Sequence, residues 1–165
     1  MASYRTCIVT CAALFLGSAV HAHDAPLSLE VSGDIASVDS VGRHDYVFSS
    51  RELHAMRAYA ITTSTNWTPV RKWVGPRLTD VLNRVGASGT RIRVIAFDDY
   101  SQVIPMAFIE KHQPVLAYEA DGKPLKLEDF GPLFLIFPRD ADPEALTSIS
   151  NTRRFVFEVR SIEVQ

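Results

Sequence analysis

Cysteine is almost absent from this 165-residue chain, and its two copies, Cys7 and Cys11, both lie near the N-terminus. From residue 23 onward the sequence contains no thiol. This excludes disulfide bonds, thiolate metal ligands and cysteine nucleophiles from that part of the chain. Long apolar runs are missing there too, because no segment approaches the roughly 20 apolar residues that a membrane-spanning helix needs.

A strong net charge is missing as well. The 17 Lys and Arg residues nearly balance the 19 Asp and Glu residues, so the chain carries no basic footprint for nucleic acid. The histidines after residue 22, which are His23, His44, His54 and His112, show no metal-ligand spacing, and no Gly-x-Ser-x-Gly motif marks a catalytic serine. We therefore predict neither a metal site nor catalytic residues, and favour a protein that is not an enzyme.

The first 22 residues have the pattern of a cleaved secretory signal. Arg5 supplies a positive start, the stretch from Cys7 to Val20 is mostly apolar, and Val20-His21-Ala22 has small residues at the cleavage positions. The same segment could instead form a buried N-terminal helix. The signal interpretation predicts a periplasmic protein whose single domain comprises residues 23–165. The lack of an Arg-Arg pair within the first 22 residues favours export of the unfolded chain.

Two polar loops beside aromatic residues stand out in the remaining sequence. The β-branched run Ala60–Trp67 predicts a strand, followed by a loop over residues 68–72. The second loop, Phe97-Asp-Asp-Tyr100, directly follows another predicted strand. Short polar side chains next to a large aromatic ring suit a flat, hydrogen-bonding small molecule, so we expect the two loops to line one pocket.

Hydrophobic periodicity predicts many short strands and few helices. The clearest helix has Leu78, Val81, Leu82 and Val85 on one face, and Gly86 ends it. Because no βαβ repeat is present, the expected fold class is α+β, a β-rich single domain. The other predictions are strands over 27–31, 46–48, 91–96, 101–104, 133–137 and 155–164, the last with a bulge near Ser161; a Ser49-x-x-Glu52 capping box; a turn at Trp73–Pro76; a helix from Pro105 to Lys111; and a hairpin at Asp121-Gly122.

The order of these pieces resembles the sulfite-oxidase fold, the domain that holds the molybdenum cofactor in sulfite oxidases and related enzymes. The resemblance covers nearly all of residues 23–165. It is carried by the loop that ends at Trp67, Trp73-Val-Gly-Pro-Arg-Leu with Asp80-Val-Leu82, Asp98-Asp-Tyr100, Tyr118-Glu-Ala-Asp-Gly-Lys-Pro-Leu125 and Gly131-Pro-Leu-Phe-Leu-Ile-Phe-Pro138. In those enzymes a cysteine near the end of the first loop strand binds molybdenum, whereas the corresponding stretch here is Thr62-Thr-Ser-Thr65. A hydroxyl is a poor substitute for a thiolate at a soft metal site.

The chain also resembles a small periplasmic branch of the same fold, whose members have one short secreted domain and no cysteine. Members of that branch are implicated in binding reduced pterins, the organic half of the molybdenum cofactor. They relay pterin status to a membrane protein that makes or degrades cyclic di-GMP. The resemblance thus implies a non-catalytic pterin-binding module whose partner is the periplasmic domain of an inner-membrane diguanylate cyclase or phosphodiesterase. A molybdenum-cofactor oxidoreductase of the sulfite oxidase type and a ligand-free interaction domain are the alternatives.

A pterin ring presents two adjacent donors, an amino group and a ring N–H, which one carboxylate can accept together. Asp98 or Asp99 could supply that carboxylate, and Trp67 or Tyr100 could stack on the ring. Each of these residues could equally serve a turn or the core. The other predicted ligand-binding residues, which offer hydroxyl, amide or guanidinium groups, are Thr63, Ser64, Thr65, Asn66, Arg139 and Arg153.

Overall fold

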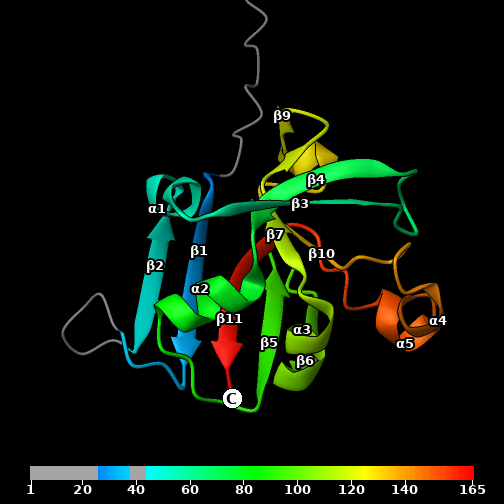
Figure 1. Cartoon of the computed structure of the whole chain (residues 1–165). Coiled ribbons are helices and arrows are strands. Elements are labelled where there is room, and N and C mark those ends of the chain that lie inside the picture. Colours follow the sequence, from blue (N-terminus) through cyan, green and yellow to red (C-terminus); the bar gives the residue numbers. More distant parts are fainter. Residues whose placement is uncertain (1–25, 38–43) are drawn as a thin grey trace, which may run out of the picture.

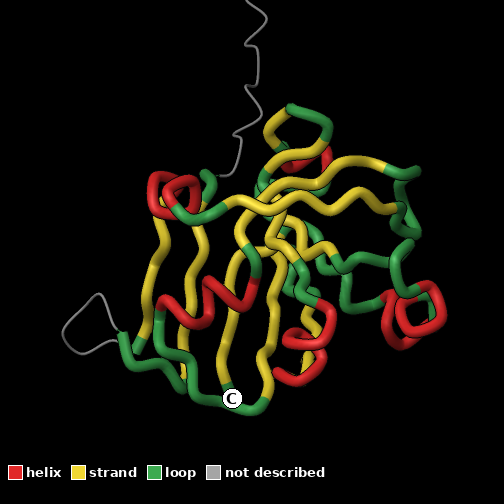
Figure 2. Tube along the Cα trace, in the orientation of Figure 1, coloured by secondary structure: helices red, strands yellow, loops and turns green. Residues whose placement is uncertain are grey.

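The structure, a computed structural model, describes residues 26–37 and 44–165. The predicted signal, residues 1–22, lies outside these ranges. The described part is an α+β domain of short strands, as predicted, and Figures 1 and 2 show its strands in a five-stranded sheet and a second group beside it. No helix in the described ranges is both long and apolar enough to cross a membrane.

The strand at the centre of the larger sheet comes last in the chain. In spatial order the strands are β2 (Asp45–Ser49), β1 (Ser28–Gly33), β11 (Val159–Val164), β5 (Arg91–Ala96) and β6 (Ser101–Pro105). β1 and β11 run parallel, whereas the other neighbours are antiparallel. A register shift between Val159 and Ser161 confirms the predicted bulge near Ser161.

A smaller, four-stranded sheet carries the loop that contains Trp67. Its strands, in spatial order, are β3 (Ala58–Thr63), β4 (Arg71–Pro76), β8 (Glu119–Ala120) and β9 (Lys123–Pro124). β3 and β4 form an antiparallel hairpin, which Figure 1 shows extending away from the larger sheet. β8 and β9 form the hairpin predicted at Asp121-Gly122. A separate antiparallel pair joins β7 (Val115–Ala117) to β10 (Phe134–Ile136).

The helices are short, and the two best-predicted ones form as expected. α1 begins with the predicted capping box, in which Glu52 N–H donates to Ser49 Oγ and the Glu52 carboxylate accepts from Ser49 N–H. α2 buries the predicted apolar face and is followed by Gly86 at φ +66°. The helices are α1 (Ser50–Ala55), α2 (Leu78–Arg84), α3 (Met106–His112), η1 (Leu127–Asp129, a 3-10 turn), α4 (Pro143–Leu146) and α5 (Ile149–Thr152).

The core is centred on the apolar run that contains β10. Every residue from Leu133 to Phe137 is fully buried, as predicted for a strand covered on both faces. Trp73 is also fully buried, and its ring meets Phe134 edge-on at a centroid distance of 5.3 Å. The Trp73 Nε1–H donates to the Thr63 carbonyl at 3.1 Å, so this large side chain leaves no polar atom unsatisfied.

Several predicted boundaries were wrong. The strand predicted over Ala60–Trp67 ends at Thr63, because the chain turns at Thr65. Trp73–Pro76 is not a turn but the last four residues of β4, whose pairing with β3 the sequence did not reveal. The last strand starts at Val159 rather than residue 155, because Glu158 at φ +54° breaks the extended chain. Pro105 precedes α3 as its N-cap instead of lying in its first turn.

Candidate functional site

A pocket of about 240 Å³ lies between the loop that follows β3 and the loop that follows β5. Its lining residues are Trp67, Asp98, Tyr100, Phe155 and Phe157. Three of the predicted ligand-binding residues, Trp67, Asp98 and Tyr100, are therefore brought together from both loops. The expectation that the two loops line one pocket agrees with this geometry, while ligand binding by these residues stays a prediction.

Aromatic contacts hold Trp67 in place without burying it. Its ring meets Phe157 edge-on at 5.5 Å and lies 6.4 Å from Phe134, yet the side chain is 47% exposed. Edge-to-face contacts favour defined ring orientations. Trp67 therefore presents a positioned aromatic surface to the pocket, and the alternative that it is a core residue is not supported.

Tyr100 is likewise positioned by its polar end. The Tyr100 hydroxyl donates to the carbonyl of Arg153 at 3.2 Å, which ties the Phe97–Tyr100 loop to the end of α5. The side chain is 41% exposed, so it is not the buried tyrosine that was one alternative. The Arg153 side chain is exposed and does not line the pocket, so this predicted ligand contributes its carbonyl to the loop instead.

The pair Asp98-Asp99 divides between pocket and surface. Asp98 Oδ1 accepts from the Tyr100 backbone N–H at 2.9 Å, a turn contact that leaves lone pairs on both carboxylate oxygens for a ligand. Asp99, at φ +65°, turns away and forms an ion pair with Arg160 at 3.0 Å on the surface. The structure therefore keeps Asp98 in the pocket and places Asp99 outside it.

Glu158 is an acidic neighbour of the pocket that the sequence did not indicate. Burial raises the pKa of the Glu158 carboxyl, and the negative charge of Asp98 raises it further. Its position depends on the left-handed backbone at φ +54°, immediately after the pocket residue Phe157. Nothing in the local sequence marks such a backbone conformation for a glutamate.

Thr63 and Ser64 are engaged by an aspartate that sequence reasoning missed. The carboxylate of Asp140 accepts from both the N–H and the hydroxyl of Ser64, each at 2.8 Å, and the Asp140 N–H donates to Thr63 Oγ1 at 3.0 Å. These hydrogen bonds lower the pKa of the Asp140 carboxyl. The Thr63 side chain is 1% exposed. The polar groups of Thr63 and Ser64 thus fasten the end of β3 to the loop after β10 and do not point into the pocket.

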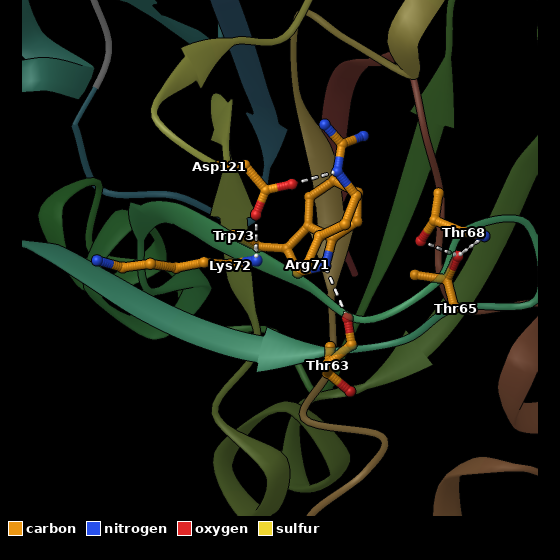
Figure 3. A network of polar contacts seen from close by, with 7 residues as sticks. All are labelled: Thr63, Thr65, Thr68, Arg71, Lys72, Trp73 and Asp121. Atoms are coloured by element: carbon orange, nitrogen blue, oxygen red, sulfur yellow. Dashed lines mark hydrogen bonds and ion pairs between the residues drawn. The ribbon is translucent and has the colours of Figure 1, made fainter.

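Thr65 shapes the loop that carries Trp67. Its hydroxyl accepts from the backbone N–H groups of Trp67 and Thr68 and is bonded to the Thr68 hydroxyl at 2.9 Å. Figure 3 shows this pair in the loop beyond Thr63 and Arg71, where β3 and β4 meet. Two more predicted ligands, Asn66 and Arg139, line a narrow cleft next to the pocket, with Trp67 and Phe155 shared between the two hollows. This cleft is too tight to hold a water molecule.

A polar network stiffens the base from which the loop extends (Figure 3). Asp121 accepts from Arg71 Nε at 2.8 Å and from the Lys72 backbone N–H at 2.9 Å, while the Arg71 guanidinium lies 5.3 Å from the Trp73 ring. These hydrogen bonds lower the pKa of the Asp121 carboxyl. The exposed Trp67 therefore sits on a loop whose two stems are fixed.

Other cavities are as large or larger, among them one of about 240 Å³ beside Phe48, Glu52 and Arg84. One of about 460 Å³ lies between α2 and α3 and is lined mainly by small, amide and hydroxyl side chains without an aromatic ring. Another of about 250 Å³ includes His54, whose ring lies 4.4 Å from Tyr118 and whose Nδ1 is 2.7 Å from the Ser50 carbonyl. We treat the pocket at Trp67 as the candidate site because it gathers three of the predicted ligand-binding residues and four aromatic side chains around one carboxylate.

Comparison with protein families gives one match. The family described as the oxidoreductase molybdopterin binding domain matches residues 35–141, well over half of the chain. The matched range includes Trp67, Asp98 and Tyr100, but Phe155 and Phe157 lie beyond it. No curated protein matches the sequence.

Proposed function

The chain belongs to the oxidoreductase molybdopterin binding domain family, and on that premise we propose that it is a non-catalytic module that binds a reduced pterin. The observation that carries the proposal is the convergence of Trp67, Asp98 and Tyr100 on one pocket. An aromatic ring and a carboxylate are the two groups that a planar, donor-rich heterocycle needs. Both are present in defined orientations.

The pocket dimensions support a small ring over the whole molybdenum cofactor. Pockets for drug-sized ligands have volumes of about 300–1,000 Å³, and this one, at about 240 Å³, lies just below that range. Asp98 can accept from the amino group and ring N–H of a pterin, because only one backbone N–H occupies its carboxylate. The Trp67 indole N–H makes no hydrogen bond within the described residues and is available to an acceptor on the ligand.

The residues at this end of β3 do not fit a molybdenum centre. No thiol occurs after residue 22. In the stretch Thr62–Thr65, the hydroxyls of Thr63 and Thr65 are nearly buried and already hydrogen-bonded to the protein. Within residues 26–37 and 44–165, no cluster of three or more His, Asp or Glu side chains could hold a metal ion. We therefore assign no step of chemistry to a metal at this site.

The signalling part of the proposal extends the resemblance described above. The protein is exported to the periplasm by its N-terminal signal, binds pterin there and reports its level to the periplasmic domain of an inner-membrane diguanylate cyclase or phosphodiesterase. The Trp67 loop supports such a role, because it leads from the pocket to the end of β3, the outer strand of its sheet, where Asp140 binds Ser64.

Calorimetric titration of the purified protein with dihydro- and tetrahydropterins tests the binding proposal. We expect micromolar dissociation constants, weakened at least tenfold by Trp67→Ala and by Asp98→Asn. Asp99→Asn is the matched control, because it makes the same change on the adjacent residue outside the pocket and should bind normally. Absence of binding, or binding that both pocket variants leave unchanged, would overturn the proposal in favour of a ligand-free interaction domain.

Metal analysis of protein exported by its own signal tests the alternative that the domain is a molybdenum-cofactor oxidoreductase. We expect no stoichiometric molybdenum. Finding about one molybdenum per chain would show that the domain holds the complete cofactor and would restore the oxidoreductase alternative.

A further inference from the structure

β3 is the outermost strand of the four-stranded sheet and, among the described residues, it pairs with β4 alone. The contacts of β4 show which backbone groups of β3 are free. Lys72 bonds to Asp121 through both its N–H and its C=O, and the Val74 C=O accepts from the Tyr118 N–H. The backbone N–H and C=O groups of Lys72 and Val74 therefore point away from β3. The alternating residues Arg71, Trp73 and Gly75 carry the backbone hydrogen bonds between β3 and β4.

The register of β3 against β4 then shows which backbone N–H and C=O groups of β3 are unpaired within the sheet. Because Gly75 and Trp73 face Tyr59 and Ile61, the N–H and C=O groups of Ala58, Ala60 and Thr62 point outward from the sheet. All three of these residues are exposed. The open edge covers about five residues, or roughly 17 Å at the usual rise of an extended strand.

The β3 edge has none of the features that normally block strand pairing. Proteins protect edge strands with lysine, proline, bulges or very short length. β9, the opposite edge of the same sheet, consists of Lys123-Pro124, and β6, an edge of the larger sheet, ends in Pro105. β3, with the sequence Ala-Tyr-Ala-Ile-Thr-Thr, contains no charge, no proline and no bulge. Its edge is therefore ready to pair with another extended segment.

Two arginines at the N-terminal end of β3 lack counter-ions. The guanidinium carbons of Arg57 and Arg77 lie 4.8 and 4.1 Å from the centroid of the Tyr59 ring, which orients both groups. Neither arginine forms an ion pair with a carboxylate in the described ranges, although Asp80 is nearby on α2. Two adjacent, unpaired cations favour an acidic group on whatever binds there.

The opposite end of the edge is negative. Asp140 lies beside Ser64, immediately after β3, so the edge has arginines at one end and a carboxylate at the other. A second copy of β3 paired antiparallel would bring its Asp140 toward these arginines, but both oxygens of that carboxylate already accept from Ser64 and the charge of Arg139 acts on it as well. The best complement is an extended segment of a different protein that carries acidic side chains at one end.

We propose that an extended, acidic segment of a partner protein adds to the four-stranded sheet along β3. Backbone hydrogen bonds to Ala58, Ala60 and Thr62 supply the affinity, and the pairing of an acidic side chain with Arg57 and Arg77 fixes the direction of the segment. The surface is separate from the pterin pocket, but Asp140 and Ser64 join the two regions at the end of β3.

The test is a two-dimensional NMR titration of the ¹⁵N-labelled protein with a synthetic peptide of alternating Thr and Val that ends in two Asp residues. We expect the largest amide shifts at Ala58, Ala60 and Thr62, and at least tenfold weaker binding when two Lys residues replace the Asp residues. Arg57→Gln with Arg77→Gln should remove that preference. Ala60→Pro should abolish binding, because it removes an outward N–H, whereas Ala60→Val keeps that N–H and should still bind.

Pterin affinity of the Ala60→Pro protein is the folding control and should be unchanged, which separates this surface from the proposed pocket. No shifts along β3, or equal binding of the Asp and Lys peptides, would overturn the proposal. Shifts along β3 that appear on raising protein concentration without peptide would also overturn it, because they would assign the edge to a second copy of this chain.

Discussion

Trp67 and Trp73 lie close together in the sequence and contact the same Phe134 ring, yet their environments are opposite. Trp73 is fully buried, and its indole N–H is bonded to the Thr63 carbonyl. Trp67 is 47% exposed and approaches Phe134 from the pocket side, at 6.4 Å. The difference arises where β3 stops, because the hydroxyl of Thr65 turns the chain before Trp67 can enter the ladder. Local hydrogen bonding, rather than hydrophobicity, decides which tryptophan joins the core.

The largest predicted effect comes from removing the buried ring. Trp73→Ala should lower the free energy of unfolding by about 3–5 kcal/mol, because it leaves a cavity beside Phe134 and removes the indole hydrogen bond to the Thr63 carbonyl. Trp67→Ala should cost about 1 kcal/mol or less, since its ring is half exposed. Urea unfolding of both variants measures the difference, and equal losses would contradict the assigned roles.

A smaller loss of stability should follow from weakening the contact between Asp140 and Ser64 near the Trp67 loop. Asp140→Asn should lower the free energy of unfolding by about 1 kcal/mol at neutral pH, because Asp140 is exposed and its bonds to Ser64 are screened by solvent. The pKa of the Asp140 carboxyl is lowered in the folded state, so this stabilisation is present above the ordinary aspartate pKa and disappears as pH falls through the lower folded value. Unfolding curves of the two proteins should therefore converge in acid. A difference that persists there would show that charge is not the cause.

The pH response near neutrality should come from His112, whose buried ring packs against Phe108. Burial lowers the pKa of His112 and the charge of Lys111 adds to this, although Asp142 at 3.7 Å acts in the opposite direction. The unfolded histidine then takes up its proton first as pH falls below about 6.5, so the free energy of unfolding should decrease from that pH down to the lower folded pKa. Thermal unfolding of His112→Gln between pH 7 and 5 should show a flatter slope than the unchanged protein. Identical slopes would mean that another group titrates.

The smallest expected effect is spectroscopic, and it isolates each tryptophan. Trp67→Phe leaves only the buried Trp73, so its emission should be blue-shifted and weakly quenched by acrylamide. Trp73→Phe leaves only the exposed Trp67, whose emission should be red-shifted and strongly quenched. Added pterin should quench the second protein and barely change the first. Quenching of both proteins to the same extent would place the ligand away from Trp67.

The elements that could be predicted from the sequence are those that depend on neighbouring residues. The α2 stripe, the α1 capping box and the Asp121-Gly122 turn are local patterns, and each was found as predicted. β4 was missed because Gly75 and Pro76 suggest a turn, whereas Gly75 is required by the close approach of the Leu116 backbone. The short helices α4 and α5 are too brief to show a periodic pattern.

The candidate site was predictable in part for the same reason. Trp67, Asp98 and Tyr100 stand beside obvious loop signals, and they meet in one pocket. Asp140 could not be found this way, because its bonds to Ser64 join residues 76 apart in the sequence. Phe155 and Phe157 alternate as strand residues do. However, the left-handed backbone at Glu158 separates them from β11, and both side chains line the pocket. Such contacts depend on how distant segments pack.

The position of β11 at the centre of the larger sheet constrains when this protein can fold. Among the described strands of this sheet, β2–β1 on one side and β5–β6 on the other are hydrogen-bonded into one sheet only through β11. A chain still emerging from the ribosome therefore holds two unconnected strand pairs until residues 159–164 are released, and such non-local sheets assemble slowly. During that interval the inner edges of β1 and β5 are unpaired, which makes the nascent chain a natural substrate for holding chaperones.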